Sequence, residues 1–267
     1  MKIFKIIFLV NCCLIACSQD RGPGYRFDLF KNTQNWELSQ AVDREDESMI
    51  DNILKSGNIN IDLQESKYGT TLLLLAVGND KPVSTKKLLE HGAKLNILDS
   101  LKISPIQEAV THIGLKKHTA EILKLLLKYG ADPNELLVRY DRVGDSIPYV
   151  STPLLGAVGN LECSKLLLEH GANLYWKYDN EYPVWFVLLS SDLKPDQNIF
   201  VAKYLIVDKK MPVPDTVCYT IPDHKPIQII SLLNEHDVHG DPEKQKTKEA
   251  ILSYLKKIDF PNHGAYR

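Results

Sequence analysis

Three segments of this 267-residue chain follow one pattern, and their repetition constrains the fold more than any other feature. Each segment opens with a hydroxyl residue, continues through two short apolar runs and ends in Gly-Ala. The openings are Thr71, Ser104 and Thr152, and the endings are Gly92, Gly130 and Gly171. An internal period of ~33 residues is typical of stacked helix pairs, each too small to bury its apolar face alone.

The residue types within each segment predict where the helices start and stop. A hydroxyl at Thr71, Ser104 or Thr152 can accept a hydrogen bond from the first turn of a helix. Pro105 and Pro153 then suit the first helical position, where a missing N–H costs nothing. Apolar residues follow at helical spacing, and the closing glycines suit a left-handed helix stop.

The openings Ser104-Pro105-Ile106-Gln107-Glu108-Ala109 and Thr152-Pro153-Leu154-Leu155-Gly156-Ala157 resemble the start of an ankyrin repeat. The resemblance implies an all-α ankyrin-repeat solenoid of about six helix pairs with short hairpin fingers. It covers residues 36–257. Ankyrin repeats bind other proteins far more often than they perform chemistry, so the resemblance implies a protein partner.

Less regular segments complete the predicted pairs. Trp36–Ala41 with Met49–Leu54 is expected to form a capping pair. Tyr182–Trp185 is expected to open a pair that continues through Phe200–Val207, without the Gly-Ala ending. Lys225–Gln228 is expected to open the last pair, whose second helix includes Ala250–Leu255 and starts after the cap Asp241-Pro242.

The distance from Ser104 to Thr152 is 48 residues, against 33 from Thr71 to Ser104, so an insertion is expected. We place part of it around His112–His118 and the larger part at residues 134–150. Lys116–Lys117 reads as an ordinary solvated pair of charges.

The first residues indicate export and lipid attachment. A basic start, Met1–Lys5, precedes the apolar run Ile6–Ala16, which is too short to span a bilayer and fits a signal peptide over residues 1–16. The run ends Leu14-Ile15-Ala16-Cys17, which resembles a bacterial lipobox and implies a lipid on Cys17. The alternative is an ordinary signal peptide. Residues 17–35 then form a tether, and residues 258–267 a C-terminal tail.

The resemblance to a lipoprotein implies a place in the cell envelope of a bacterium. Ser18 follows the lipidated cysteine in place of the aspartate that retains many lipoproteins at the inner membrane. We therefore expect the periplasmic face of the outer membrane. Loss of Lys2 and Lys5 takes the formal charge from −2 to −4, which gives no electrostatic basis for nucleic-acid binding.

Processing leaves two cysteines, Cys163 and Cys218. Cys163 occupies a buried position of a second helix, and we interpret it as a small core residue. A Cys163–Cys218 disulfide is compatible with an oxidising periplasm, but the spacing alone does not establish one.

The sequence predicts no catalytic residue, no cofactor and no metal ion. It holds no nucleophile elbow, phosphate loop or paired-cysteine zinc motif. His91 and His170 end helices, where histidine interacts favourably with the helix dipole. His236 and His239, with Asp237 and Asp241, have metal-like content, but zinc needs three or four ordered ligands and a loop that caps the next helix explains them better.

The partner-binding surface is predicted on the fingers and on the concave face made by first helices. The finger tips are Asn96–Ile103, Asn134–Val150, Asn173–Glu181 and Val213–Lys225. Two tips are rich in Tyr, Trp and Arg, the residue types that dominate interface energetics. The candidate binding residues are Tyr140, Arg142, Tyr149, Tyr175, Trp176, Tyr178 and Glu181. Packing between irregular pairs explains these aromatics equally well, and Tyr182 and Trp185 are assigned to packing.

Three functions remain open at this point. The first is a membrane-tethered binder, monomeric when free, of the immunity type. Ankyrin-like lipoproteins resemble inhibitors found with secreted antibacterial effectors, including type VI phospholipases, so a lipase effector is the implied partner. The second is an envelope scaffold or stress-related lipoprotein that inhibits nothing. The third is an enzyme with an unrecognised site, using His236 and His239.

Overall fold

The computed structural model describes residues 25–111, 116–139, 149–178, 182–189, 198–214, 216–219, 226–235, 238 and 240–260. They fall into two compact units. The N-terminal unit contains the described residues of Cys17–Gly156 and Glu169–Ala172. The C-terminal unit contains those of Ala157–Leu168 and Asn173–Arg267. Among the described residues, no helix combines the length and the apolar character that crossing a bilayer requires.

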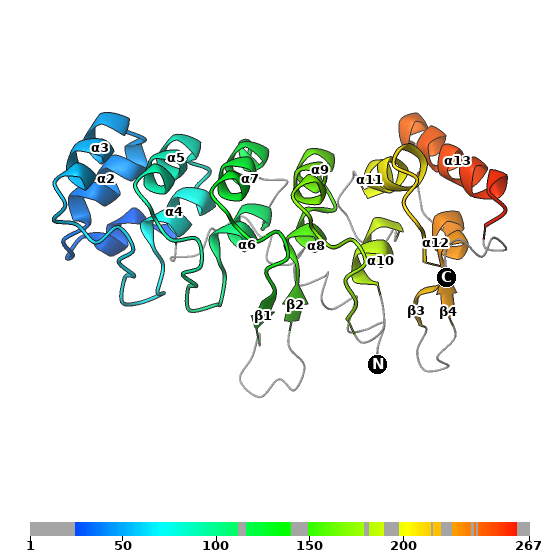
Figure 1. The fold of residues 1–267 in the computed structure, drawn as a ribbon, viewed down its shortest axis with the longest axis horizontal. Helices are drawn as coiled ribbons and strands as arrows, with labels where there is room; N and C mark the ends of the chain where they lie inside the picture. Colours follow the sequence, from blue (N-terminus) through cyan, green and yellow to red (C-terminus); the bar gives the residue numbers. More distant parts are fainter. Residues whose placement is uncertain are drawn as a thin grey trace. The chain divides into compact units, whose positions relative to one another are not determined.

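The N-terminal unit is a stack of helix pairs (Figure 1). After the short 3₁₀ helix η2 (Phe27–Phe30), inner and outer helices alternate along the chain. They are α2 (Trp36–Arg44), α3 (Glu47–Lys55), α4 (Leu72–Gly78), α5 (Pro82–Glu90), α6 (Pro105–Val110), α7 (Thr119–Lys128) and α8 (Pro153–Ala157), whose last residue is the first of the C-terminal unit. Between α7 and α8, β1 (Leu137–Arg139) pairs antiparallel with β2 (Tyr149–Ser151).

The predicted helix starts and stops of this unit are confirmed. The side-chain oxygens of Thr71, Ser104 and Thr152 accept hydrogen bonds from the amides of Leu74, Gln107 and Leu155. Pro105 and Pro153 are the first residues of their helices. Gly92, Gly130 and Gly171 have φ of 85°, 96° and 91°, the left-handed conformation that a side chain would disfavour.

A second set of caps links consecutive pairs, and the sequence analysis did not predict it. Glu45 and Asp80 stand between inner and outer helices with positive φ of 56° and 59°. The Glu45 carboxylate accepts from the amide of Val83, 2.9 Å away, at the start of α5 in the next pair. Asp80 likewise accepts from the amides of Lys117 and His118 ahead of α7. Each carboxylate therefore satisfies N–H groups that the next outer helix cannot pair internally.

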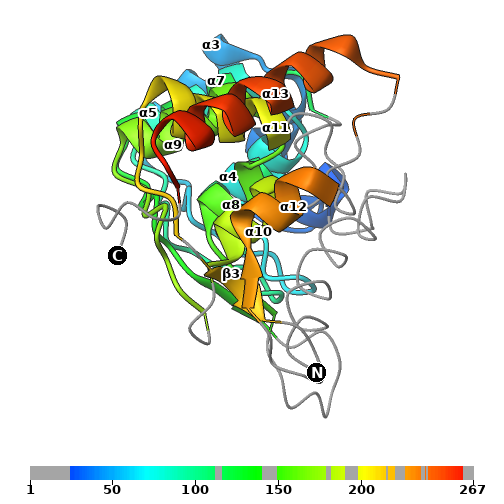
Figure 2. The same ribbon diagram turned by 90° about the vertical axis from the view of Figure 1, so that its right-hand side faces the viewer.

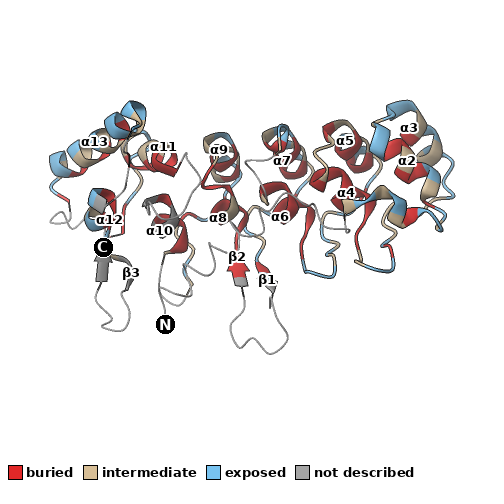
Figure 3. Ribbon diagram, turned by 180° about the vertical axis from the view of Figure 1, so that it is seen from behind, coloured by how far each residue is buried: buried red, intermediate tan, exposed pale blue. Residues whose placement is uncertain are grey.

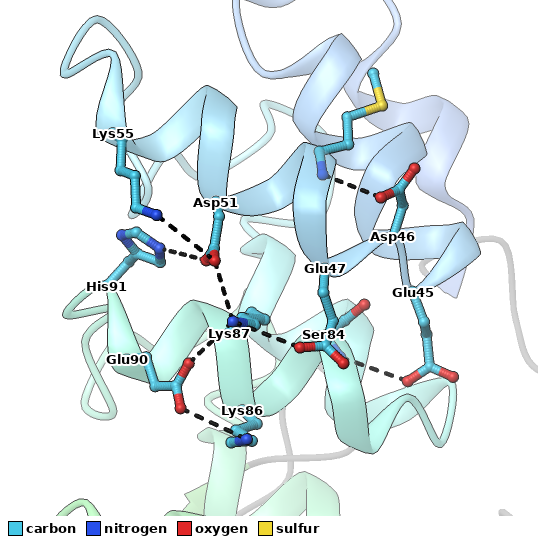
Figure 4. Close-up of polar contacts among 11 residues, drawn as sticks. Glu45, Asp46, Glu47, Asp51, Lys55, Ser84, Lys86, Lys87, Glu90 and His91 are labelled. Atoms are coloured by element: carbon cyan, nitrogen blue, oxygen red, sulfur yellow. Dashed lines mark hydrogen bonds and ion pairs between the residues drawn. The ribbon is translucent and has the colours of Figure 1, made fainter.

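The outer helices α3 and α5 also share a polar cluster (Figure 4). Asp51 of α3 lies 2.9 Å from His91 Nε2 and 3.1 Å from Lys87 Nζ. Lys87 also pairs with Glu47 and Glu90. Hydrogen bonds from His91 and then Lys87 lower the pKa of Asp51 to about 2. His91 therefore links two helix pairs, in addition to ending its own helix.

The interior of the N-terminal unit is apolar, and two inner helices are enclosed on all sides. Every residue of α4 and every residue of α6 is buried. The outer helices α5 and α7 instead alternate buried and exposed residues, as Figure 3 shows by colour. This enclosure differs from the concave inner-helix face that we expected to be open to a partner.

The residues before α2 extend the folded unit. Phe30 is fully buried, and Asn35 donates through Nδ2 to the carbonyl of Asn60 at 2.8 Å. The part of the expected tether that lies between Tyr25 and Asn35 is therefore packed against the helix pairs.

Lys116 corrects one expectation. Its side chain is 3% exposed and its Nζ lies 2.9 Å from Glu108 Oε1, whose own side chain is 4% exposed. It also donates to the Glu108 carbonyl at 2.8 Å. The interpretation of Lys116 as a solvated charge was wrong, because a sequence window does not show that Glu108 of α6 faces this loop.

The C-terminal unit is less regular (Figure 2). Its helices are α9 (Leu161–Glu169, whose last residue clusters with the other unit), α10 (Pro183–Leu189), α11 (Asn198–Lys203), α12 (Ile229–Glu235) and α13 (Pro242–Lys257), with the π-helix η3 (Tyr204–Asp208) continuing α11. An antiparallel pair joins β3 (Thr216–Tyr219) to β4 (Pro226–Gln228). α13 packs against α11 and η3.

One boundary in this unit was predicted wrongly. Pro226–Gln228 forms strand β4 rather than a helix start, and α12 begins at Ile229. β4 pairs with β3, so tertiary pairing overrides the local resemblance of Pro226 to a helix-start proline. Other expectations are confirmed. Asp241 caps α13 by accepting from the amides of Glu243 and Lys244, both at 3.0 Å.

Two interior residues of this unit match their predicted packing roles. Trp185 of α10 is fully buried. Cys163 of α9 is a free, fully buried thiol, and burial raises its pKa to about 12.

Candidate protein-binding surface

We number the fingers from the loop between α3 and α4 (residues 56–71), which is the first. The second finger (residues 94–103) is a tight turn built around Asp99. Its Oδ1 accepts from the amides of Leu101 and Ile103, at 2.8 and 2.9 Å. Lys102 takes a φ of 65°, which closes the turn. Ile103 is buried, while Leu101 points into solvent with 57% of its surface exposed. The turn therefore holds a leucine outward at its tip.

The third finger (residues 132–151) extends into the β1–β2 hairpin. Asp132 Oδ1 accepts from the amide of Asn134 at 2.8 Å, which starts the turn. Leu136 and Val138 are 50% and 44% exposed, and Leu137 between them is buried. This alternation is what an extended segment with one packed face produces.

Hydrogen bonds hold the fingers to their neighbours. Gln64 Nε2 donates to the carbonyl of Leu98 at 2.9 Å, and the Ser100 amide donates to the carbonyl of Tyr68 at 2.8 Å, so the first finger is joined to the second. Gln107 Nε2 of helix α6 donates to the Glu135 carbonyl of the third finger at 2.7 Å. The fingers lie along one side of the N-terminal unit (Figure 1).

Burial raises the pKa of Glu135, against the opposing effect of a hydrogen bond from Ser104. Since Ser104 also caps α6, the third finger is tied to the same residue that starts the inner helix. Both fingers are therefore held by the helix pair that they flank.

All the large apolar side chains that are exposed in the described part of the chain lie on these two fingers. They are Leu98, Leu101, Leu136 and Val138, and we call them the finger-tip surface. Exposed apolar residues that gather in one region of a folded protein are candidates for an interaction site, and these four lie on two consecutive fingers. These fingers were predicted to bind the partner, but through aromatic residues rather than through these four.

The fourth finger, described over residues 173–178, carries the aromatic candidates of the C-terminal unit. Tyr175 donates through its hydroxyl to the Pro212 carbonyl at 2.8 Å, and its ring lies 6.4 Å from that of Trp185. Burial and then the charge of Tyr182 raise its pKa to about 12. Tyr175 is therefore a packing residue as much as a surface residue.

Trp176 and Tyr178 differ from Tyr175. Their rings stack with centroids 6.1 Å apart, and both side chains are half-buried. Tyr175, Trp176 and Tyr178 thus lie on one finger, and a stacked pair remains accessible there.

The other predicted residues have no described side chain. Tyr149 lies in β2, paired with Arg139, and its side chain is outside the described residues. Cys17, Tyr140, Arg142 and Glu181 lie outside them altogether, as do His236, Asp237 and His239. Over the part of the chain that the structure describes, no group of three or more His, Cys, Asp or Glu side chains could hold a metal ion.

Comparison with known proteins agrees with this architecture. A family model described as ankyrin repeats (3 copies) matches residues 38–136. Residues 38–136 carry ankyrin repeats. The crystal structure of EF0377, an ankyrin repeat protein, aligns with a TM-score of 0.56 over 85% of this chain and 99% of that one, at 21% sequence identity.

Two curated relatives are similar over part of their length. The ankyrin repeat protein FPV031 of fowlpox virus is 30% identical over 122 residues, which are 46% of this chain and 33% of that protein. The ankyrin repeat domain-containing protein SAT10 of Stachybotrys chartarum is 30% identical over 157 residues, 52% of this chain and 7% of that protein. The chain thus spans a third or less of either relative.

The ankyrin-repeat fold predicted from the sequence is confirmed. Ankyrin repeats are a protein–protein interaction module, and the fold is typically a non-enzymatic one. The finger-tip surface is accordingly the candidate site for a protein partner.

Proposed function

We propose that this protein is a membrane-anchored binder of another protein, and in its sharper form an immunity-type inhibitor. It would bind and neutralise a secreted antibacterial effector such as a type VI phospholipase. The observation that carries the binding role is the finger-tip surface, four exposed apolar side chains on the second and third fingers, which flank helix α6.

The proposed anchor is a lipid on Cys17, supported by the lipobox-like Leu14-Ile15-Ala16-Cys17. Several acyl chains hold a protein stably to a bilayer where a single chain does not. Anchoring at the periplasmic face of the outer membrane would keep the inhibitor at high local concentration where a phospholipase works.

Inhibition would require no chemistry in this chain. The finger-tip leucines would fill apolar depressions around the entrance of the effector's active site, and the stacked Trp176 and Tyr178 would add a second contact. No cofactor or metal ion is needed for this role.

The test is a pull-down from envelope extract of cells that express their secretion systems, with bound proteins identified by mass spectrometry. Leu101→Ser plus Leu136→Ser should reduce capture of a single stoichiometric hydrolase on the order of tenfold or more, the effect of losing about 1.4 kcal/mol. Trp176→Ala plus Tyr178→Ala tests the fourth finger separately.

Glu121→Ser plus Lys124→Ser is the matched control, because it changes two exposed side chains on the outer helix α7 without altering the net charge. Capture of several envelope proteins at low occupancy, indifferent to all three double variants, would replace the inhibitor by the envelope scaffold. Retention of radiolabelled fatty acid by the wild type but not by Cys17→Ser tests the anchor independently.

A further inference from the structure

Tyr25, from the segment ahead of η2, lies on the inner helices α4 and α6. A Cβ atom added to Gly78 at the end of α4 would lie 2.6 Å from Tyr25 Cε1, closer than any side chain allows. The ring therefore rests directly on the glycine backbone. Gly78 does not need positive φ, so the close approach of Tyr25 is the structural reason for a glycine here.

Polar groups hold both ends of Tyr25. Its hydroxyl donates to Glu108 Oε2 of α6 at 2.9 Å. Its backbone carbonyl accepts from Asn79 Nδ2 at 3.0 Å, immediately after α4. Helix α6 thus binds the phenol hydroxyl, and the residue after α4 binds the main chain. Gly78 of α4 contacts the ring.

The acceptor for the phenol is itself fixed. Lys116 Nζ lies 2.9 Å from Glu108 Oε1, so the two carboxylate oxygens serve two separate donors. The Lys116 and Glu108 side chains are almost entirely buried. Because removing either member would leave a desolvated charge, the pair keeps the Glu108 carboxylate in place as an acceptor for the phenol.

We propose that Gly78, Asn79, Glu108 and Lys116 form a binding site for a peptide tyrosine, filled in this chain by its own Tyr25. We call these four residues the tyrosine socket. The socket binds an extended segment. A flat ring fits because Gly78 has no Cβ atom, and a hydroxyl group is bound because Glu108 accepts its hydrogen bond.

The socket occupies the inner-helix side of α4 and α6, where ankyrin repeats would otherwise offer surface. This position agrees with the burial of every residue in α4 and α6.

If Cys17 is the lipid-bearing residue, the socket also sets the length of the tether, and this consequence rests on the proposed function. Tyr25 lies eight residues beyond Cys17, a reach of at most about 29 Å. With the socket empty, the next fully buried anchor is Phe30, which allows about 47 Å.

Cleavage by trypsin after Arg26 measures release of the segment, because Arg26 is exposed and adjoins Tyr25. Cleavage of a transiently opened segment follows the population of the open form. We expect Tyr25→Ala to be cut there several-fold faster than the full-length wild type. Tyr25→Phe keeps the ring on Gly78 and loses one hydrogen bond, so its increase should be smaller.

Gly78→Ala tests the socket from the side of the helix, and circular dichroism checks that the variant is folded. Alanine favours a helix over glycine, so α4 itself should not weaken. Its methyl group would nevertheless lie 2.6 Å from Tyr25 Cε1 and 3.1 Å from Glu108 Oε1, so it displaces the Tyr25 ring, and cleavage after Arg26 should again accelerate in the folded variant. Tyr129→Ala, which removes a ring lying over Lys128, is the control and should leave the rate unchanged.

The socket is refuted if Tyr25→Ala or folded Gly78→Ala is cut after Arg26 no faster than the wild type. It is refuted equally if Tyr129→Ala accelerates cleavage as much as they do. The assay contains neither membrane nor partner, so its failure leaves the proposed function standing. Failure to find a lipid or a partner leaves the socket standing.

Discussion

The two units of this chain use the same kind of helix pair but stabilise it differently. In the N-terminal unit, hydroxyl caps start the inner helices α4, α6 and α8, and the carboxylates of Glu45 and Asp80 cap the outer helices α5 and α7 of the following pairs. In the C-terminal unit, α11 ends in a π-helix, two strands precede α12, and the long helix α13 packs against α11.

The difference shows what happens when a repeat loses its motif. The N-terminal pairs are held in register by hydrogen bonds that recur from one pair to the next. The C-terminal unit contains Trp185, the largest fully buried side chain in the described part of the chain, whereas most of the other large buried side chains belong to the N-terminal unit. Single substitutions should act locally in both units, because each helix pair of a repeat protein contacts mainly its neighbours.

The largest effect is expected from Trp185→Ala. Truncating a fully buried tryptophan costs about 3–5 kcal/mol, because apolar burial is lost and a cavity remains. Hydrogen exchange followed by mass spectrometry should show lost protection in α10, α11 and α13 and retained protection in α4–α7. An equal loss of protection in both units would show that they unfold together, and the two units would then not differ in how they are stabilised.

Asp80→Ala should come next, with a loss of roughly 2 kcal/mol in the free energy of unfolding. It removes the acceptor for the amides of Lys117 and His118 and places alanine at a φ of 59°. Asp80→Asn is the matched control, because asparagine tolerates this conformation and keeps an acceptor oxygen. Urea denaturation of both variants checks the prediction, and a negligible loss in Asp80→Ala would mean that the cap between pairs contributes nothing.

The sequence predicted the regular pairs because each determinant lies within a few residues of the helix that it controls. Thr71 caps its own helix, and Gly92 ends one. Such local signals are readable without knowing the tertiary structure. The ankyrin resemblance then supplied the order of inner and outer helices.

Contacts between distant residues were not readable in this way. Glu45 caps a helix that begins almost forty residues later, and Lys116 meets Glu108 across a loop. The strand at Pro226–Gln228 depends on a partner strand, and a proline before apolar residues reads equally well as a helix start. The exposed Leu101 looks like a core residue until the Asp99 turn is known to hold it outward.

A smaller effect, which depends on pH, is expected at Asp51. Its pKa is lowered from 3.8 to about 2, so its contribution is fully present above pH 3.8 and is lost as the pH falls toward 2. Asp51→Asn should therefore lower the urea midpoint at pH 7 and have less effect at pH 2.5. The wild-type-minus-variant difference cancels the titration of other carboxylates. A difference that does not shrink on acidification would mean that Asp51 acts without its charge.

The last prediction concerns the labelling of Cys163, which measures local opening of the C-terminal unit and is expected to involve the smallest change in stability. With a pKa raised to about 12 by burial, its thiol holds almost no reactive thiolate at pH 8. A thiol reagent should therefore label Cys163 only when α9 opens, and peptide mapping identifies the labelled site. Trp185→Ala should accelerate this labelling, whereas Asp80→Ala, in the other unit, should leave it unchanged. Acceleration by Asp80→Ala would mean that loss of a cap in the N-terminal unit opens the C-terminal one, and the two units would then have to be treated as one cooperative structure.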